Sequence, residues 1–193
     1  MEEIAEAAGV TKPLVYQHFA SKRALYLELV DSVAEDLLSS IGAATAAAPS
    51  PRAQVEDGFA AYFAMVVAHE TAFRLLYARS SPADVEASNA LRRVEDAIAE
   101  AIDPLIAAGL APEHRRFLAY AVVGMAEGAC RHWIETRPTR PRDPGGRDGG
   151  RGEERDGGRD GERDGERGRQ EAQRLARRLA DLAWAGLRAV HAD

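Results

Sequence analysis

Side chains with the chemistry to contact DNA are concentrated in one short stretch near the N-terminus, from Ile4 to Leu25. A glutamine there can pair with an adenine edge, a leucine can pack on a thymine methyl group, and a lysine can reach guanine or a phosphate. A tyrosine and a histidine can donate hydrogen bonds to phosphate oxygens. In chain order these residues are Lys12, Leu14, Tyr16, Gln17 and His18. We predict one short helix that presents them together to a DNA groove.

The residues around this helix predict a helix-turn-helix. Gly9 suits the positive φ that the turn requires. Thr11 can cap the second helix, and Pro13 falls in its first turn, where a missing N–H costs little. Ser21 can cap the next helix, whose first residue, Lys22, adds positive charge beside the DNA backbone. The side chains expected to face inward are Ile4, Ala5, Ala8, Val10, Val15 and Phe19.

The composition of the chain limits where DNA binding can occur. The chain has 193 residues, of which 46% are hydrophobic, and a formal net charge of -6. Because the overall charge is negative, affinity for DNA must come from a local cluster of charge. The single cysteine, Cys130, excludes an intramolecular disulfide and a multi-cysteine zinc site. We predict no metal and no cofactor. Without an apolar run of roughly 20 residues or a signal peptide, we expect a cytoplasmic protein with no membrane contact.

The remainder of the chain is predicted to be helical, so the fold class is all-α. Alanine, leucine, glutamate and arginine dominate, and apolar residues recur at three- and four-residue spacing. We expect helices over about 2–8, 12–19, 22–47, 51–69, 73–79, 82–108, 112–135 and 170–190. Ser50 is the expected N-cap of the fourth helix, and Asp103-Pro104 should kink the sixth.

One segment, 137–169, differs from the rest. Its residues are arginine, glycine, aspartate, glutamate, proline and threonine, and a near-repeat RDGG RDGE RDGE runs from Arg155 to Glu166. A segment without apolar side chains cannot offset the entropy of ordering itself, so we predict a disordered insert between the last two helices. The alternative, an RGG-like nucleic-acid tail, is disfavoured by the acidic residues and by the absence of aromatic side chains.

The stretch IAEAAGVTKPLVYQHFASKRALYLELV resembles the DNA-binding segment of the TetR family of bacterial transcriptional regulators. The AGV turn, the Tyr-x-His-Phe end of the second helix and the Ser-Lys start of the next all match. The resemblance implies a DNA-binding domain at 1–26 and a ligand-binding and dimerisation domain at 27–193. It implies that phosphates are contacted by Thr11, Tyr16, His18 and Lys22. It implies that base edges are contacted by Lys12, Pro13, Leu14 and Gln17. The alternative for Tyr16 and His18 is packing within the small domain.

The stretch departs from the family pattern in one respect. Family members carry a further helix of some 20 to 30 residues before this point, which completes the three-helix core. Two short helices cannot bury their apolar faces alone. We therefore expect either that translation starts upstream of Met1, which we favour, or that the DNA-binding domain is truncated and weakened.

In the family, the last two long helices pair with their copies in a dimer. Small residues and a leucine stripe in the corresponding helices fit such an interface, although an intramolecular core is the alternative for part of the stripe. The predicted dimer residues are Ala121, Gly124, Gly128, Leu175, Leu179, Leu182 and Gly186. An effector pocket is expected among aromatic and polar side chains of the middle helices, each of which has ordinary core packing as its alternative. The predicted pocket residues are Phe59, Tyr62, Phe63, Phe117, Tyr120 and Glu127.

We therefore expect a homodimer that binds a near-palindromic operator in double-stranded DNA and releases it when a small molecule binds, as a repressor would. The histidines are scattered and no HExxH, GxSxG or phosphate-binding glycine loop is present, so an enzyme is disfavoured. The remaining alternative is a dimeric ligand-binding or protein-interaction module that has lost DNA binding.

Overall fold

The computed structural model describes residues 1–78, 85–106, 109–137 and 157–190, and every regular element in these ranges is helical. The elements are α1 (Glu2–Ala7), α2 (Lys12–His18), α3 (Lys22–Ala47), α4 (Pro51–Ala68), α5 (Glu70–Ala78), α6 (Val85–Ile102), the 3₁₀ turn η1 (Asp103–Leu105), α7 (Pro112–Thr136) and α8 (Gly157–Ala189). The all-α prediction is confirmed. None of the described helices is long and apolar enough to cross a membrane.

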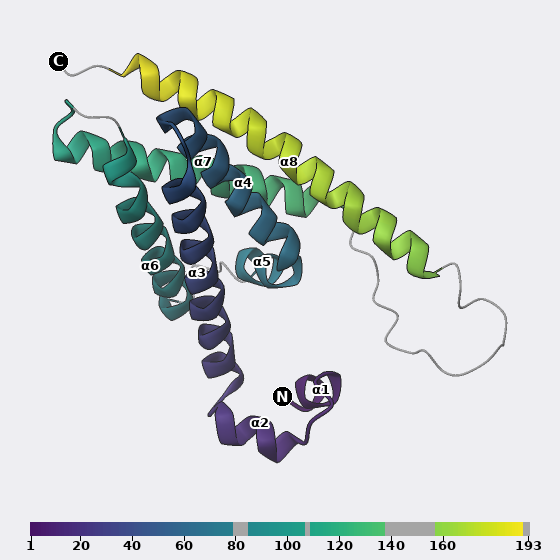
Figure 1. Cartoon of the computed structure of the whole chain (residues 1–193). Helices are drawn as coiled ribbons and strands as arrows, with labels where there is room; N and C mark the ends of the chain where they lie inside the picture. Colours follow the sequence, from purple (N-terminus) through teal and green to yellow (C-terminus); the bar gives the residue numbers. More distant parts are fainter. Residues whose placement is uncertain (79–84, 107–108, 138–156, 191–193) are drawn as a thin grey trace.

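The long helix α3 joins the two ends of the molecule (Figure 1). Its N-terminal end carries α1 and α2, and the remainder of its length packs against α4 and α6. Buried side chains recur along one face at helical spacing. They are Tyr26, Val30, Val33, Leu37, Ile41 and Thr45. The same helix therefore carries the buried stripe of the bundle and, at its N-terminal end, α1 and α2.

Helix α8 lies along α4 (Figure 1). The buried face of α8 is made of alanines. The buried residues are Ala172, Ala176, Ala180 and Ala183. Small side chains allow two helix axes to approach closely, and the larger leucines are left to the flanks. Leu175 and Leu179 are accordingly only half-buried against this core. The predicted leucine stripe is therefore partly core and partly surface.

Helix boundaries set by local chemistry agree with the sequence. The side chains of Ser21 and Ser50 accept cap hydrogen bonds from Ala24 N and Ala53 N. Helix α6 ends at Ile102 and continues as η1 at the predicted Pro104 position. The expected start of α6 at Pro82 and its expected end at Ala108 lie outside the described residues. Two of the other boundaries differ by more than one residue: α5 begins at Glu70 rather than Phe73, and α8 begins well before Gln170.

The prediction of disorder over 137–169 is wrong for the described part of that segment. Helix α8 begins at Gly157, and 138–156 lie outside the described residues. Exposed side-chain pairs along this part of α8 add a small stabilisation, since Glu166 accepts hydrogen bonds from Arg169 at 2.8 Å and from Gln170 at 3.2 Å. Residues three and four apart face one another on a helix, and helix growth from the packed end of α8 is cooperative.

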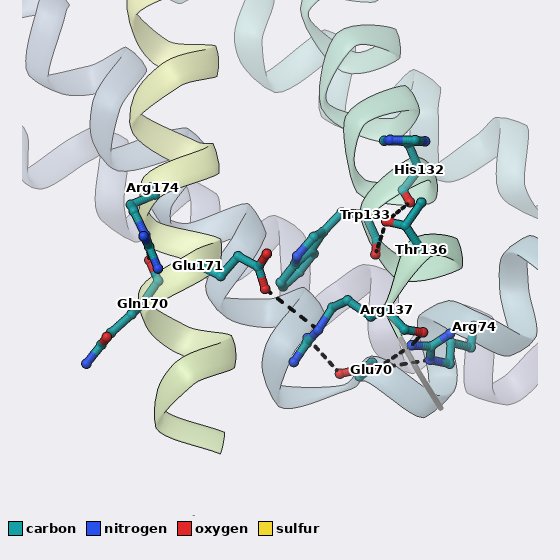
Figure 2. A network of polar contacts seen from close by, with 9 residues as sticks. All are labelled: Glu70, Arg74, His132, Trp133, Thr136, Arg137, Gln170, Glu171 and Arg174. Carbon is teal, nitrogen blue, oxygen red and sulfur yellow. Dashed lines mark hydrogen bonds and ion pairs between the residues drawn. The ribbon is translucent and has the colours of Figure 1, made fainter. Parts of the chain in front are cut away.

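The first residue of that segment, Arg137, links three helices (Figure 2). Its guanidinium pairs with Glu70 of α5 at 3.1 Å and lies 4.0 Å from Glu171 of α8. It also stacks over the Trp133 ring of α7, with 4.7 Å between the guanidinium carbon and the ring centroid. These contacts secure the C-terminal end of α7 against α5 and α8.

The Arg137 contacts explain a buried glycine in α8. A Cβ added at Gly168 would lie 2.7 Å from Arg137 Nη2, whereas one added at Gly165 would meet its nearest neighbour at 3.9 Å.

We expect Gly165→Ala to stabilise the fold by about 0.5–1 kcal/mol, because alanine favours the helix. Gly168→Ala should gain less or destabilise, since Arg137 must move. Thermal unfolding of both variants measures the difference. An equal gain in both would contradict the placement of Arg137, and no change in either would contradict the helix at 157–169.

Candidate nucleic-acid interface

The turn between α1 and α2 is built as the sequence predicts. Gly9 has a φ of 66°. Its N–H bonds to Glu6 O at 3.1 Å, and the N–H of Val10 bonds to Ala5 O at 3.0 Å. This pair of hydrogen bonds around a left-handed residue is the Schellman arrangement, which satisfies the last carbonyls of a helix. It sets the direction in which α2 leaves α1.

The small core of this region differs in part from the prediction. Ala5 and Val15 are buried, and Ile4 and Phe19 are half-buried, as expected. The prediction that Ala8 and Val10 face inward is wrong, because both are exposed in the part of the chain that the structure describes. Both lie in the turn after α1, where the chain has already left the packed face.

Every residue predicted to contact DNA is exposed. They are Thr11, Lys12, Pro13, Leu14, Tyr16, Gln17, His18 and Lys22. Leu14 is 40% exposed and Tyr16 is 48% exposed, which is high for large apolar and aromatic side chains. Thr11 is the N-cap residue of α2, but its side chain makes no cap hydrogen bond, so its predicted capping role is wrong. Its hydroxyl is thereby left to solvent.

Two ion pairs at this end of the molecule were not predicted. Lys12 pairs with Glu2 at 3.1 Å, and Arg23 pairs with Glu86 of α6 at 2.7 Å. Both pairs are solvent-exposed, so each contributes little to stability. The second joins the first turn of α3, next to Lys22, to the start of α6. Its partners are 63 positions apart, and nothing local in the sequence indicates this pairing.

Most of the predicted dimer residues are exposed. Ala121, Gly124 and Gly128 of α7 are exposed, as are Leu182 and Gly186 of α8. A Cβ added at Gly124, Gly128 or Gly186 would meet nothing within 4 Å. No contact within the subunit therefore requires glycine at these positions.

The structure divides the predicted pocket residues among different surroundings. Phe59 and Tyr62 line a cavity of about 80 Å³, the apolar cavity, together with residues of α3, α6 and α7. Phe63 is buried but packs against Trp133, with 5.9 Å between ring centroids. The Tyr120 hydroxyl donates to the Asp96 carboxylate. Phe117 is 71% exposed, so its assignment to the pocket is wrong. Aromatic content does not show which face of a helix is buried.

Glu127 lines a second cavity of about 40 Å³, the Glu127 cavity. The other walls of this cavity come from α3, α4, α5 and α6. Burial, the largest cause, and the nearby Glu95 carboxylate together raise the pKa of Glu127 to about 7. The opposing effect of Arg131 is smaller than that of Glu95. A carboxyl group that is costly to ionise has therefore been placed beside apolar side chains.

This pKa predicts how stability depends on pH. Between pH 4.5 and about 7 the folded protein holds a proton on Glu127 that the unfolded chain releases, so the contribution of this group to stability declines as pH rises through that window. We expect Glu127→Gln to raise the melting temperature at pH 8, and the gain to vanish below about pH 4.5. Glu135→Gln, an exposed site on the same helix, is the control. A gain for Glu127→Gln that is equal at both pH values would contradict the raised pKa.

The fold and the exposed residues together define a class of protein: a helical chain with an N-terminal helix-turn-helix carried on a long connecting helix. Comparison with known proteins agrees. Residues 1–29 match the family described as "Bacterial regulatory proteins, tetR family". The chain is 28% identical over 145 residues to the HTH-type transcriptional activator FasR of Mycolicibacterium smegmatis, a match covering 74% of this chain and 65% of that relative.

A solved structure shares the fold. It is a transcriptional regulator of the TetR/AcrR family from Thermobifida fusca, with a TM-score of 0.55 and 19% identity, covering 93% of this chain and 84% of that one. The resemblance drawn from the sequence is thus confirmed: residues 1–29 match the TetR-family model, and the solved structure has the same fold. This family and the relative consist of transcriptional regulators, which are not enzymes.

Proposed function

We propose that this protein is an effector-responsive transcriptional regulator that binds operator DNA as a homodimer. The observation that carries the proposal is the exposed set of DNA-type side chains on α2 and at the start of α3, within the segment that matches the family. Lys22 lies in the first turn of α3, where the helix dipole is positive and a cation is unfavourable. A phosphate bound there offsets this cost.

The proposed contacts fall into two groups. Thr11, Tyr16, His18 and Lys22 contact phosphates, which gives affinity that depends on salt. Lys12, Pro13, Leu14 and Gln17 face base edges, which gives sequence preference. Lys12 is also paired with Glu2. Because the same ammonium group is proposed to contact DNA, this ion pair has to open or share the lysine when DNA binds.

The proposed dimer uses the exposed surface of α7 and α8. Phe117 and Leu182 are 71% and 60% exposed, which is unusual for such large apolar side chains. Gly124 and Gly128 follow Phe117 on the same face of α7 at spacings near a helical repeat. A second copy covers these residues in a two-fold interface, which sets two α2 helices about one DNA turn apart.

The proposed effector acts through α3. Val30, Val33 and Leu37 of α3 line the Glu127 cavity, and Ile41 lines the apolar cavity. A molecule bound in either cavity contacts the helix whose N-terminal end carries α1 and α2. Binding therefore favours one position of that helix over another and shifts the equilibrium between DNA-binding and free conformations.

Selection of genomic fragments by the purified full chain, followed by footprinting near 0.1 M salt, tests this function. We expect a protected near-palindrome, and its place relative to the promoter decides between two roles. Protection over the promoter supports the repressor predicted from the sequence, and protection upstream supports an activator, as the Mycolicibacterium relative is named. A stable dimer with no footprint on any fragment would overturn the proposal.

A further inference from the structure

The chemistry of the two cavities points to a class of effector. The apolar cavity and the Glu127 cavity are both lined by Tyr62 and Ile98, so these two side chains lie at the junction between them. A molecule that extends past this junction touches both. The lining of the apolar cavity is dominated by aliphatic side chains, among them Val55, Ile102 and Val123.

Polar groups on the walls of the cavities are few. Thr45 faces the apolar cavity, but its hydroxyl already donates to Ile41 O at 2.9 Å. Gln54 and Tyr62 are neutral. Among the described residues that line either cavity, Glu127 is the one with a charged side chain. A ligand that spans the two spaces therefore meets a carboxylate at one end and hydrocarbon at the other.

The surroundings of Glu127 favour a cation over an anion. Its neighbour Glu95 on α6 carries the same charge, and the opposing charge comes from Arg131 on α7. Helix α4 contributes Tyr62 to this cavity, whereas α3 and α5 contribute apolar side chains, among them Leu37 and Phe73. A bound ammonium group lowers the free-energy cost of burying the ionised Glu127 carboxylate and offsets its repulsion by Glu95. A bound carboxylate adds to that repulsion.

We propose that the two cavities bind a small amphipathic amine, with its apolar body in the apolar cavity and its ammonium group paired with Glu127. This assignment rests on the proposed function only in treating the amine as the effector. A dry cavity of about 150 Å³ accommodates benzene, so spaces of about 80 Å³ and about 40 Å³ suit a ligand of similar size.

Hexylamine, hexan-1-ol and hexanoate share one carbon chain and differ in the head group, so they form a matched set of probes. Calorimetric titration of the full chain without DNA at pH 8 should give an affinity for hexylamine at least about 10-fold above that for hexan-1-ol, as expected for a charge-assisted hydrogen bond. Glu127→Gln should remove the difference, and Glu135→Gln should retain it.

The pH dependence gives a second readout. Hexylamine stays protonated between pH 8 and 6, whereas Glu127 becomes largely protonated, so the affinity should fall roughly 10-fold across this interval. Equal binding of amine and alcohol, tighter binding of hexanoate, or no binding of any probe would overturn the proposal. DNA binding is measured separately without amine, so failure of the amine site and failure of the regulator function are distinguishable.

Discussion

Leu182→Asp is expected to convert the proposed dimer into monomers and to remove operator binding. In a two-fold interface each substitution occurs twice, so two leucine side chains lose burial and two carboxylates enter the contact. At about 2 kcal/mol for each lost leucine, the dimer dissociation constant should rise at least about 10³-fold. Light scattering of the purified variant across a concentration series measures this change.

Val85→Asp is the matched control. Val85 on α6 is 66% exposed and Leu182 is 60% exposed, so the two substitutions add the same charge at apolar side chains of similar accessibility. Val85→Asp should remain dimeric and bind DNA as the parent does. Because a monomer engages one half-site at a time, Leu182→Asp should weaken operator binding at least about 100-fold without altering helical content. A dimeric Leu182→Asp variant would place the interface elsewhere.

The parts of the fold that the sequence predicts well are those that short-range chemistry determines. The α3 boundaries agree because Ser21 caps one end and the apolar stripe from Tyr26 to Ile41 keeps a helical period throughout. The α1–α2 turn agrees because a glycine at position 9 removes the steric cost of positive φ. These features depend on residues within a few positions of one another.

The features that the sequence does not predict depend on contacts between distant residues. The early start of α8 accompanies the docking of Arg137 between Glu70 and Glu171, and counting apolar residues over 137–169 carries no information about it. Phe117 belongs to the exposed face of α7 because the opposite face packs on other helices. The exposure of the candidate DNA-contact residues is predicted better, since most of them lie on α2, whose outward side follows from the positions of Ala5 and Val15.

The substitutions Lys22→Ala and Gln17→Ala are expected to weaken DNA binding in different ways. Lys22→Ala removes one proposed phosphate contact from each subunit, so it should reduce affinity roughly 10- to 100-fold on every sequence and lower the salt slope by about 2 per dimer. Gln17→Ala removes a base contact, worth about 1–3 kcal/mol of discrimination, and should relax preference at two symmetry-related positions while leaving the salt slope unchanged.

Arg177→Ala is the control that distinguishes the loss of a local phosphate contact from the general effect of removing a positive charge. It removes the same charge as Lys22→Ala, from an exposed side chain of α8 rather than from the first turn of α3. Binding titrations at several salt concentrations, on the selected operator and on a scrambled duplex, should leave Arg177→Ala close to the parent. If Lys22→Ala and Arg177→Ala lose the same amount of DNA affinity, the start of α3 is not a phosphate site. If Gln17→Ala loses affinity equally on both duplexes, the outward face of α2 contacts the DNA backbone rather than the bases.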